Sequence, residues 1–322
     1  MSRHGFCLLA ASLLLTAACR RKQEESAKVD VKTEAVVVKP DITAALRSVW
    51  GSSASDVWAV GSGGSIVHYD GNTWSVLDSV TTHNLQGVSG TAADDVWAVG
   101  ENGLTLHFDG KTWSQTDKSE GATLMSIWAV GRQDVWVSGV ATEAGLLRHY
   151  SYNAAKGAAA WENLTLDGTA SLWRTWASSA TDVWMVGSDL NARGLVVRGD
   201  GKDFKPVKFD GANLRGITGA GPDDAWAAAY DGALHHWDGK EWKQAALVQG
   251  AHWLNMWGAG PRDLWAFGID GALHHFDGES WKPVASGTKE ILWSAWGSAP
   301  NDVWFVGNKG TRLHWNGEKI GS

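Results

Sequence analysis

Residues 48–61 read Ser-Val-Trp-Gly-Ser-Ser-Ala-Ser-Asp-Val-Trp-Ala-Val-Gly, and variants of this stretch return six more times along the chain. The steps between successive Asp residues of the copies are 39, 39, 48, 42, 39 and 39. Self-similarity at such a period indicates a repeat architecture. An Asp–apolar–Trp triplet marks every copy, beginning at Asp56, Asp95, Asp134, Asp182, Asp224, Asp263 and Asp302.

Each copy divides into four short apolar runs separated by turn residues. In the first copy the runs cover 46–51, 57–60, 65–69 and 73–77, and Ser-, Gly- or Asp-Gly-rich segments join them. Runs of this length with Gly and Asp between them are typical of antiparallel strands joined by tight hairpins. The sequence therefore predicts an all-β fold over residues 35–322, a seven-bladed β-propeller of four-stranded antiparallel blades.

The ends of the repeat region predict how the ring closes. In the seventh copy, the Trp that marks the fourth run is replaced by Ile320, and the sequence ends two residues later. We therefore expect the last blade to lack its own fourth strand. Residues 35–39 (AVVVK) precede the first copy and have no blade of their own. We expect them to pair as the outer strand of blade seven, which would leave few unpaired edges.

Composition excludes some partners and sites. The 322 residues carry 28 Lys plus Arg and 35 Asp plus Glu, a formal charge of -7, which lacks the positive field needed for sequence-independent binding of nucleic acid. The two cysteines, Cys7 and Cys19, both precede the repeats. The repeat region can therefore form neither a disulfide nor a Cys-based metal site.

The first residues are typical of an export signal. The apolar run 6–15 is too short for a membrane-spanning helix, which makes residues 1–18 a signal peptide. Residues 15–19 (LTAAC) resemble the bacterial lipobox, and this resemblance implies a lipid anchor on Cys19. Residue 20 is Arg and not Asp, and by resemblance to bacterial lipoprotein sorting rules this favours the outer membrane over the inner one. The sequence leaves open whether the propeller faces the periplasm or the outside. Residues 19–34 are then a disordered tether, and an ordinary cleaved signal is the alternative.

Four columns of repeated residues have structural interpretations. The two Trp columns are expected to pack between blades, and the Asp column to accept backbone N–H bonds that fix turns. The His column could suggest a metal ring, but its members belong to different blades, whereas zinc ligands converge within about 2 Å of one ion. We therefore expect inter-blade hydrogen bonds from this column, no metal and no cofactor. It contains His68, His107, His149, His236, His275 and His314, with Arg198 in the fourth copy.

One position differs freely between copies. It lies nine residues before each Asp, at the start of the expected innermost strand, and strand starts should ring the mouth of the central channel. Arg47, Trp173, Arg215 and Trp293 are the candidate binding residues, since Arg and Trp are frequent anchors of protein interfaces. A solvated rim is the alternative. The column reads Arg47, Gln86, Met125, Trp173, Arg215, Leu254 and Trp293.

The repeat resembles three known groups over about residues 46–317. Its V-W-G and D-V-W-A-V-G segments are similar to BNR/Asp-box repeats, to tectonin repeats and to the Asp-Val-Trp-Ala-Val-Gly repeats of bacterial envelope propellers. These resemblances imply the propeller fold. Tectonins imply binding of glycan or lipopolysaccharide. Sialidases with Asp-boxes need an arginine triad and a Tyr–carboxylate pair, which the sequence does not reveal.

These patterns together predict a binding protein. No acid, base, nucleophile and metal ligand converge in the repeat pattern, so we expect no enzyme activity. The leading hypothesis is a monomeric, non-catalytic scaffold lipoprotein of the bacterial cell envelope that recognises a protein partner through one face. A glycan-binding lectin with a polysaccharide partner is the second hypothesis, and a glycan-cleaving enzyme is the third. Contact with the membrane is expected through the lipid anchor only.

Overall fold

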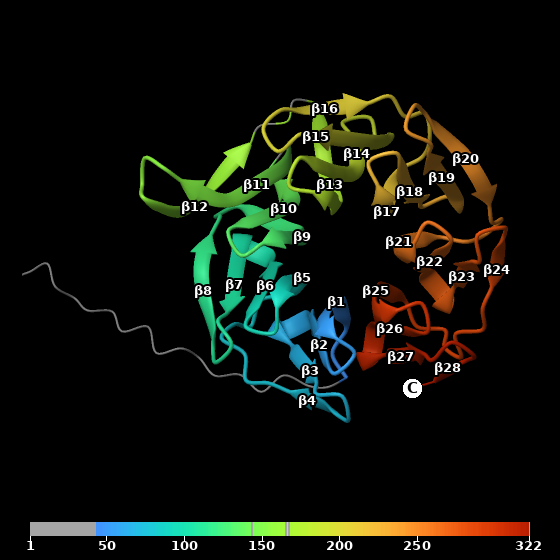
Figure 1. Ribbon diagram of the computed structural model, residues 1–322, viewed down its shortest axis with the longest axis horizontal. Helices are drawn as coiled ribbons and strands as arrows, with labels where there is room; N and C mark the ends of the chain where they lie inside the picture. The colour runs from blue at the N-terminus through green and yellow to red at the C-terminus, as the bar shows by residue number, and fades with distance from the viewer. Residues whose placement is uncertain (1–42, 143, 165, 167, 322) are drawn as a thin grey trace, which may run out of the picture. The chain divides into compact units, whose positions relative to one another are not determined.

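The computed structural model describes residues 43–142, 144–164, 166 and 168–321, all within the compact unit Val36–Ser322. Its strands form seven four-stranded antiparallel sheets, which stand like blades around a central channel (Figure 1). The predicted seven-bladed propeller is therefore confirmed. The predicted signal peptide (1–18), the anchor Cys19, the tether (19–34) and the closing segment 35–39 lie outside the described residues. Among the described residues, no helix is long and apolar enough to cross a bilayer.

The strands of each blade follow one another in sequence from the channel outward. Blades 1 and 2 are β1 (Leu46–Ser53), β2 (Asp56–Gly61), β3 (Ile66–Tyr69) and β4 (Trp74–Val76), then β5 (Leu85–Ala92), β6 (Asp95–Gly100), β7 (Leu104–Phe108) and β8 (Trp113–Lys118). Blades 3 and 4 are β9 (Ala122–Gly131), β10 (Asp134–Ala141), β11 (Ala144–Asn153) and β12 (Ala158–Leu164), then β13 (Thr169–Ser179), β14 (Asp182–Asp189), β15 (Gly194–Gly199) and β16 (Phe204–Val207).

Blades 5 to 7 repeat the same order. Blade 5 is β17 (Leu214–Gly221), β18 (Asp224–Ala229), β19 (Ala233–Trp237) and β20 (Trp242–Leu247). Blade 6 is β21 (Trp253–Gly260), β22 (Asp263–Gly268), β23 (Leu273–Phe276) and β24 (Trp281–Pro283). Blade 7 is β25 (Leu292–Ala299), β26 (Asp302–Gly307), β27 (Arg312–Trp315) and β28 (Ile320–Gly321). Four short 3-10 turns link second and third strands: η1 (Ser62–Gly64), η2 (Glu101–Gly103), η3 (Ile269–Gly271) and η4 (Asn308–Gly310).

The core lies between blades and not within them. Trp58 and Val60 of blade 1 pack against Leu85, Val88 and Val96 of blade 2, and each of these side chains is at most 5% exposed. Both faces of a blade are therefore covered, which explains why the second strands read as nearly continuous apolar runs instead of alternating ones. The predicted packing role of the Trp columns is confirmed.

The Trp residues of the first strands explain a glycine in the first strand of the next blade. A Cβ on Gly51 would lie 2.7 Å from the ring of Trp296 in the preceding blade, and a Cβ on Gly90 would lie 2.8 Å from the ring of Trp50. Gly219 has the same relation to Trp176. One blade therefore supplies the Trp ring, and the next blade has a glycine where any side chain would collide with that ring.

The ring closes by packing blade 7 against blade 1. Trp304 and Val306 share a core cluster with Leu46 and Val49, and the Val49 amide donates to Ser294 Oγ over 3.3 Å. Blade 7 also has a fourth strand, because β28 pairs with β27 through Ile320 and Trp315. The expectation that the last blade lacks this strand is therefore wrong. The part assigned to residues 35–39 stays a prediction.

The Asp and His columns form pairs inside each blade. In blade 1, Trp58 and His68 are cross-strand neighbours, and the ring nitrogen His68 Nε2 lies 2.6 Å from Asp56 Oδ1. The same carboxylate accepts hydrogen bonds from Ser52 Oγ and from Trp58 Nε1, the latter over 3.1 Å. The predicted inter-blade bonds of His are therefore wrong, and so is the predicted capping of backbone N–H groups by Asp56.

Arg198 takes the His position in blade 4 and makes equivalent contacts. Its Nε donates to Asp182 Oδ1 over 2.6 Å, and its guanidinium carbon lies 4.4 Å from the ring centre of Trp184. A flat cation can replace imidazole here because both offer a planar donor that stacks on indole. Within the described part of the chain, no group of three His, Cys, Asp or Glu residues is arranged to hold a metal ion.

Candidate functional site

A β-bulge places one residue of every first strand at the channel mouth. In β1, Leu46 pairs with Gly61 and Ser48 with Val60, which leaves Arg47 outside the ladder. The other first strands skip the equivalent residue. A bulge turns the side chain of the unpaired residue away from its regular direction. All seven blades therefore present their most variable position through one backbone device.

The seven bulged residues line one cavity of about 260 Å³, and Arg174 joins them. We call this cavity the channel mouth. The structure therefore brings together Arg47, Trp173, Arg215 and Trp293, the four residues singled out from the sequence. The lining residues are Arg47, Gln86, Met125, Trp173, Arg174, Arg215, Leu254 and Trp293.

Four of these residues form two Arg–Trp pairs across blade boundaries. The guanidinium carbon of Arg47 lies 4.2 Å from the ring centre of Trp293, and that of Arg215 lies 4.2 Å from the ring centre of Trp173. The first pair joins blades 1 and 7, and the second joins blades 4 and 5. Such contacts contribute about 0.5–1 kcal/mol each when half-exposed. They also hold both charges flat against the wall of the mouth.

Several donors at the mouth have no acceptor. Arg47 Nε, Trp173 Nε1 and Arg215 Nε are buried and have no hydrogen-bond partner among the described residues. Burial also lowers the pKa of the Arg47 guanidinium, partly offset by Glu101, and burial lowers the pKa of Arg215. Both groups nevertheless keep their charge at neutral pH, since arginine loses its proton only in strong alkali.

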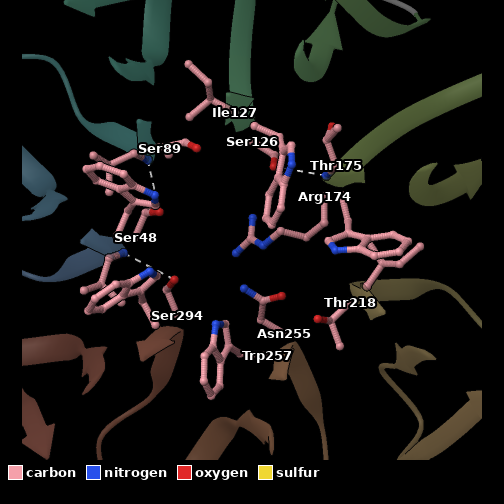
Figure 2. Close-up of a pocket in the computed structure, with 18 of the residues that line it drawn as sticks. Ser48, Ser89, Ser126, Ile127, Arg174, Thr175, Thr218, Asn255, Trp257 and Ser294 are labelled. Atoms are coloured by element: carbon pink, nitrogen blue, oxygen red, sulfur yellow. Dashed lines mark hydrogen bonds between the residues drawn. The ribbon is translucent and has the colours of Figure 1, made fainter. Parts of the chain in front are cut away.

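Arg174 crosses the channel beneath the mouth. Figure 2 shows its side chain reaching toward the middle of the channel, into which Asn255 also points. Its Nη1 donates to the carbonyl oxygens of Trp173 (3.0 Å) and Met125 (3.4 Å), and its Nη2 donates to that of Trp293 (3.5 Å). Burial, together with the charges of Arg215 and Arg47, lowers its pKa to about 10. Arg174 therefore remains a cation at neutral pH, surrounded by other cations.

Sequence reasoning missed Arg174, although the repeat carried a signal. Six of the seven residues eight positions before the Asp markers are small or uncharged, and Arg174 alone is large and charged. In regular strands, neighbouring residues point to opposite faces. Because Trp173 occupies a bulge, both Trp173 and Arg174 face the mouth cavity. The column reads Ser48, Gly87, Ser126, Arg174, Gly216, Asn255 and Ser294.

Below Arg174 the channel continues as a second cavity of about 240 Å³. Its walls carry hydroxyls that join neighbouring blades: Ser48 Oγ accepts from the Val88 amide and Ser126 Oγ from the Thr175 amide, each over 3.1 Å (Figure 2). These hydroxyls replace backbone pairing between first strands. Their hydrogen bonds explain why serine suits this column.

The side chains that line the channel carry positive charge. The described residues that line its two cavities include three arginines and no Asp, Glu, His, Lys, Cys or Tyr. A reaction that needs a general acid or base finds no titratable side chain there within the physiological range. An acidic protein thus concentrates positive charge at the centre of its ring.

Comparisons with known proteins extend only to the fold. No protein-family model matches the chain, and no curated protein matches its sequence. Many solved structures resemble it, and they include three that each cover 87% of this chain. These three are YCF48 bound to D1 peptide (18% identity, 94% of that chain, TM-score 0.66), YCF48 from Cyanidioschyzon merolae (17%, 98%, 0.65) and the WD40 β-propeller domain of Doa1 (12%, 95%, 0.67). At these identities the chain shares with them the seven-bladed β-propeller fold.

Proposed function

We propose that the protein is a non-catalytic binding scaffold that recognises a protein partner through the channel mouth. The observation that carries this proposal is the mouth itself, where two Arg–Trp pairs and Arg174 surround a cavity that offers donors and apolar walls. Arg and Trp are enriched among residues that dominate protein interfaces. The solved structure of YCF48 bound to D1 peptide supports the idea that a propeller of this shape can accommodate a peptide.

Replacing the four mouth residues Arg47, Trp173, Arg215 and Trp293 by Ala should weaken partner binding at least about 30-fold, the loss of about 2 kcal/mol typical of one interface anchor. The fold should survive, because sister blades carry Gln86, Met125 and Leu254 at this position. Pull-downs from solubilised envelope would identify the partner, and titration of it against both proteins would give the ratio.

A matched control changes the opposite face. Arg132 forms an exposed ion pair with Asp94 in a turn before a second strand, and Arg132→Ala should leave binding unchanged. If the four-residue variant bound its partner as well as the original protein does, the site would lie elsewhere. The β11–β12 hairpin, with Tyr152 60% exposed, would then be the next candidate. Hydrolysis of a glycan-array ligand, or array binding without a protein partner, would argue against this proposal.

We also propose that the scaffold is a monomer held at the bacterial outer membrane by a lipid on Cys19. The export signal and the lipobox-like residues 15–19 support this location. Cys19→Ser should move the protein from the membrane fraction to the soluble fraction, since one thioether-linked anchor would be lost. Fractionation and labelling with palmitate measure the two effects. A wild-type chain that never takes up palmitate would show that the anchor assignment is wrong.

A further inference from the structure

We propose that the channel mouth is a receptor for a carboxylate group of a peptide, and that Arg174 is the residue that holds it. This inference rests on the proposed function and names the chemistry that the partner must present. It assigns a role to Arg174, the one charged side chain among the described residues that lines both cavities of the channel. The carboxylate would enter past the two Arg–Trp pairs and meet Arg174 beneath them.

The first argument is unneutralised charge. Arg47, Arg174 and Arg215 line one cavity, and none of the described residues lining it is acidic. Glu101 is the acid that acts on Arg47, but its carboxylate already accepts hydrogen bonds from Asn84, one of them 2.8 Å long. The pKa of Arg174, lowered to about 10 by burial and by the other two arginines, reflects the same crowding of charge. An incoming anion would relieve this repulsion.

The second argument is the surplus of donors. Arg174 has five N–H groups, and its hydrogen bonds go to three carbonyl oxygens at 3.0–3.5 Å, which leaves donors for a ligand. Arg47 Nε, Arg215 Nε and Trp173 Nε1 lack acceptors as well. A carboxylate offers acceptor sites only and forms short, strong bonds with guanidinium groups. The ligand group that fits this surplus is therefore an anion with two coplanar oxygens.

The third argument favours a peptide over an acidic sugar. Sugars stack on open indole faces, whereas here guanidinium groups cover one face each of Trp173 and Trp293 at 4.2 Å. Sugar hydroxyls also need acceptors, and none of the described residues around the mouth supplies a carboxylate. Met125 and Leu254 add apolar walls beside the arginines. A carboxylate next to an apolar side chain matches this lining.

The test uses the purified full-length chain and two pairs of defined peptides in titration calorimetry. One pair is N-acetylated Leu-Ala-Leu with a free carboxylate or an amide at its C-terminus. The other is amidated Leu-Glu-Leu or Leu-Gln-Leu. We expect the carboxylate member of at least one pair to bind about tenfold or more tightly than its neutral twin, the range for a hydrogen bond to a charged group. Preference within the first pair indicates a chain terminus, and preference within the second indicates an acidic side chain.

Arg174→Ser tests the residue, since serine occupies the equivalent position in Ser48, Ser126 and Ser294 and is compatible with the fold. It should remove the preference for the carboxylate peptide while the thermal midpoint stays close to that of the original protein. Arg132→Ser removes the same charge from the opposite face and should keep the preference. A second variant, Arg174→Lys, keeps the charge but loses the planar fork, and should show an intermediate preference.

Three results would overturn the inference: equal binding of both members of each pair, a preference that survives in Arg174→Ser, or a glucuronate oligosaccharide that binds more tightly than any peptide. Failure of this inference can be separated from failure of the proposed function. If the four-residue mouth variant loses the captured partner but Arg174→Ser keeps it, the scaffold function stands and the carboxylate site is wrong. If the mouth variant keeps the partner, the proposed binding surface itself is wrong.

Discussion

Trp265→Ala is expected to lower the free energy of unfolding by about 4 kcal/mol, within the range for removing a fully buried Trp. Trp265 is fully buried between blades 6 and 7, where its ring centre lies 5.2 Å from that of Phe305 and 5.3 Å from that of Trp315. Truncation would leave a cavity that these rings, each held in its own strand, cannot fill. Urea denaturation followed by circular dichroism would measure the loss.

Trp173→Ala is the matched control, because it deletes the same side chain at the half-exposed channel mouth. Its cost should be near 1 kcal/mol, mainly the lost stacking with Arg215. Equal losses for the two variants would show that inter-blade packing of Trp does not hold the ring together. The same Trp173 variant should weaken peptide binding, whereas Trp265→Ala should leave binding unchanged in the folded fraction.

The blade architecture could be predicted from the sequence because the same four-strand pattern is repeated seven times. Any single run such as 57–60 is ambiguous between a buried strand and a helix segment, but the constant spacing of the Asp–apolar–Trp triplets removes that ambiguity. The glycines of the first strands support the same interpretation, since Gly51 and Gly90 have no side chain where a Trp ring from the neighbouring blade packs. Repetition also identified the channel mouth, because position 47 and its equivalents vary in size and charge, whereas the position before them is Leu in six copies and Trp253 in the other.

Details that depend on local backbone geometry could not be predicted from the sequence. The pairing of His68 with Asp56 inside one blade follows from strand register, which spacing along the chain does not specify. A type I′ turn centred on Asp70-Gly71, the usual geometry for an Asp-Gly hairpin, would need positive φ at both residues, yet φ is positive at Gly71 (+91°) and not at Asp70. Asp70 instead starts the turn, where its carboxylate accepts from the amides of Asn72 (2.9 Å) and Thr73 (2.8 Å).

Arg174 shows why only part of the channel mouth could be predicted from the sequence. Strict alternation along β13 would send Trp173 and Arg174 to opposite faces, and the sequence contains no mark of the bulge that turns both toward the mouth. A comparison of side-chain size along every column of the repeat would have found Arg174 as the exception. Its function would still have required the structure, because the absence of a nearby carboxylate is a three-dimensional fact about the residues that line the channel.

Gly64→Ala is expected to lower the free energy of unfolding by about 3 kcal/mol or more, whereas Gly63→Ala should cost about 1 kcal/mol. Gly63 (φ +64°) and Gly64 (φ +76°) both lie in η1, so an added Cβ brings similar backbone strain at either position. The surroundings differ. A Cβ on Gly63 meets nothing within 4 Å, but a Cβ on Gly64 would lie 2.0 Å from the carbonyl oxygen of Thr81. Chemical denaturation of the two variants would compare the losses.

Sister blades provide the control for this pair. The position of Gly63 is occupied by Asn102, Asp270 and Lys309, each with φ between +52° and +57°, so Gly63→Asn should be close to neutral. The position of Gly64 remains glycine in these blades, and there a Cβ would approach Ser119 O to 1.8 Å and Thr288 O to 2.1 Å. Equal losses for Gly63→Ala and Gly64→Ala would mean that backbone strain alone sets the cost. A much larger loss for Gly64→Ala would show that the turn is fixed by its close approach to the loop between blades, beside the channel mouth.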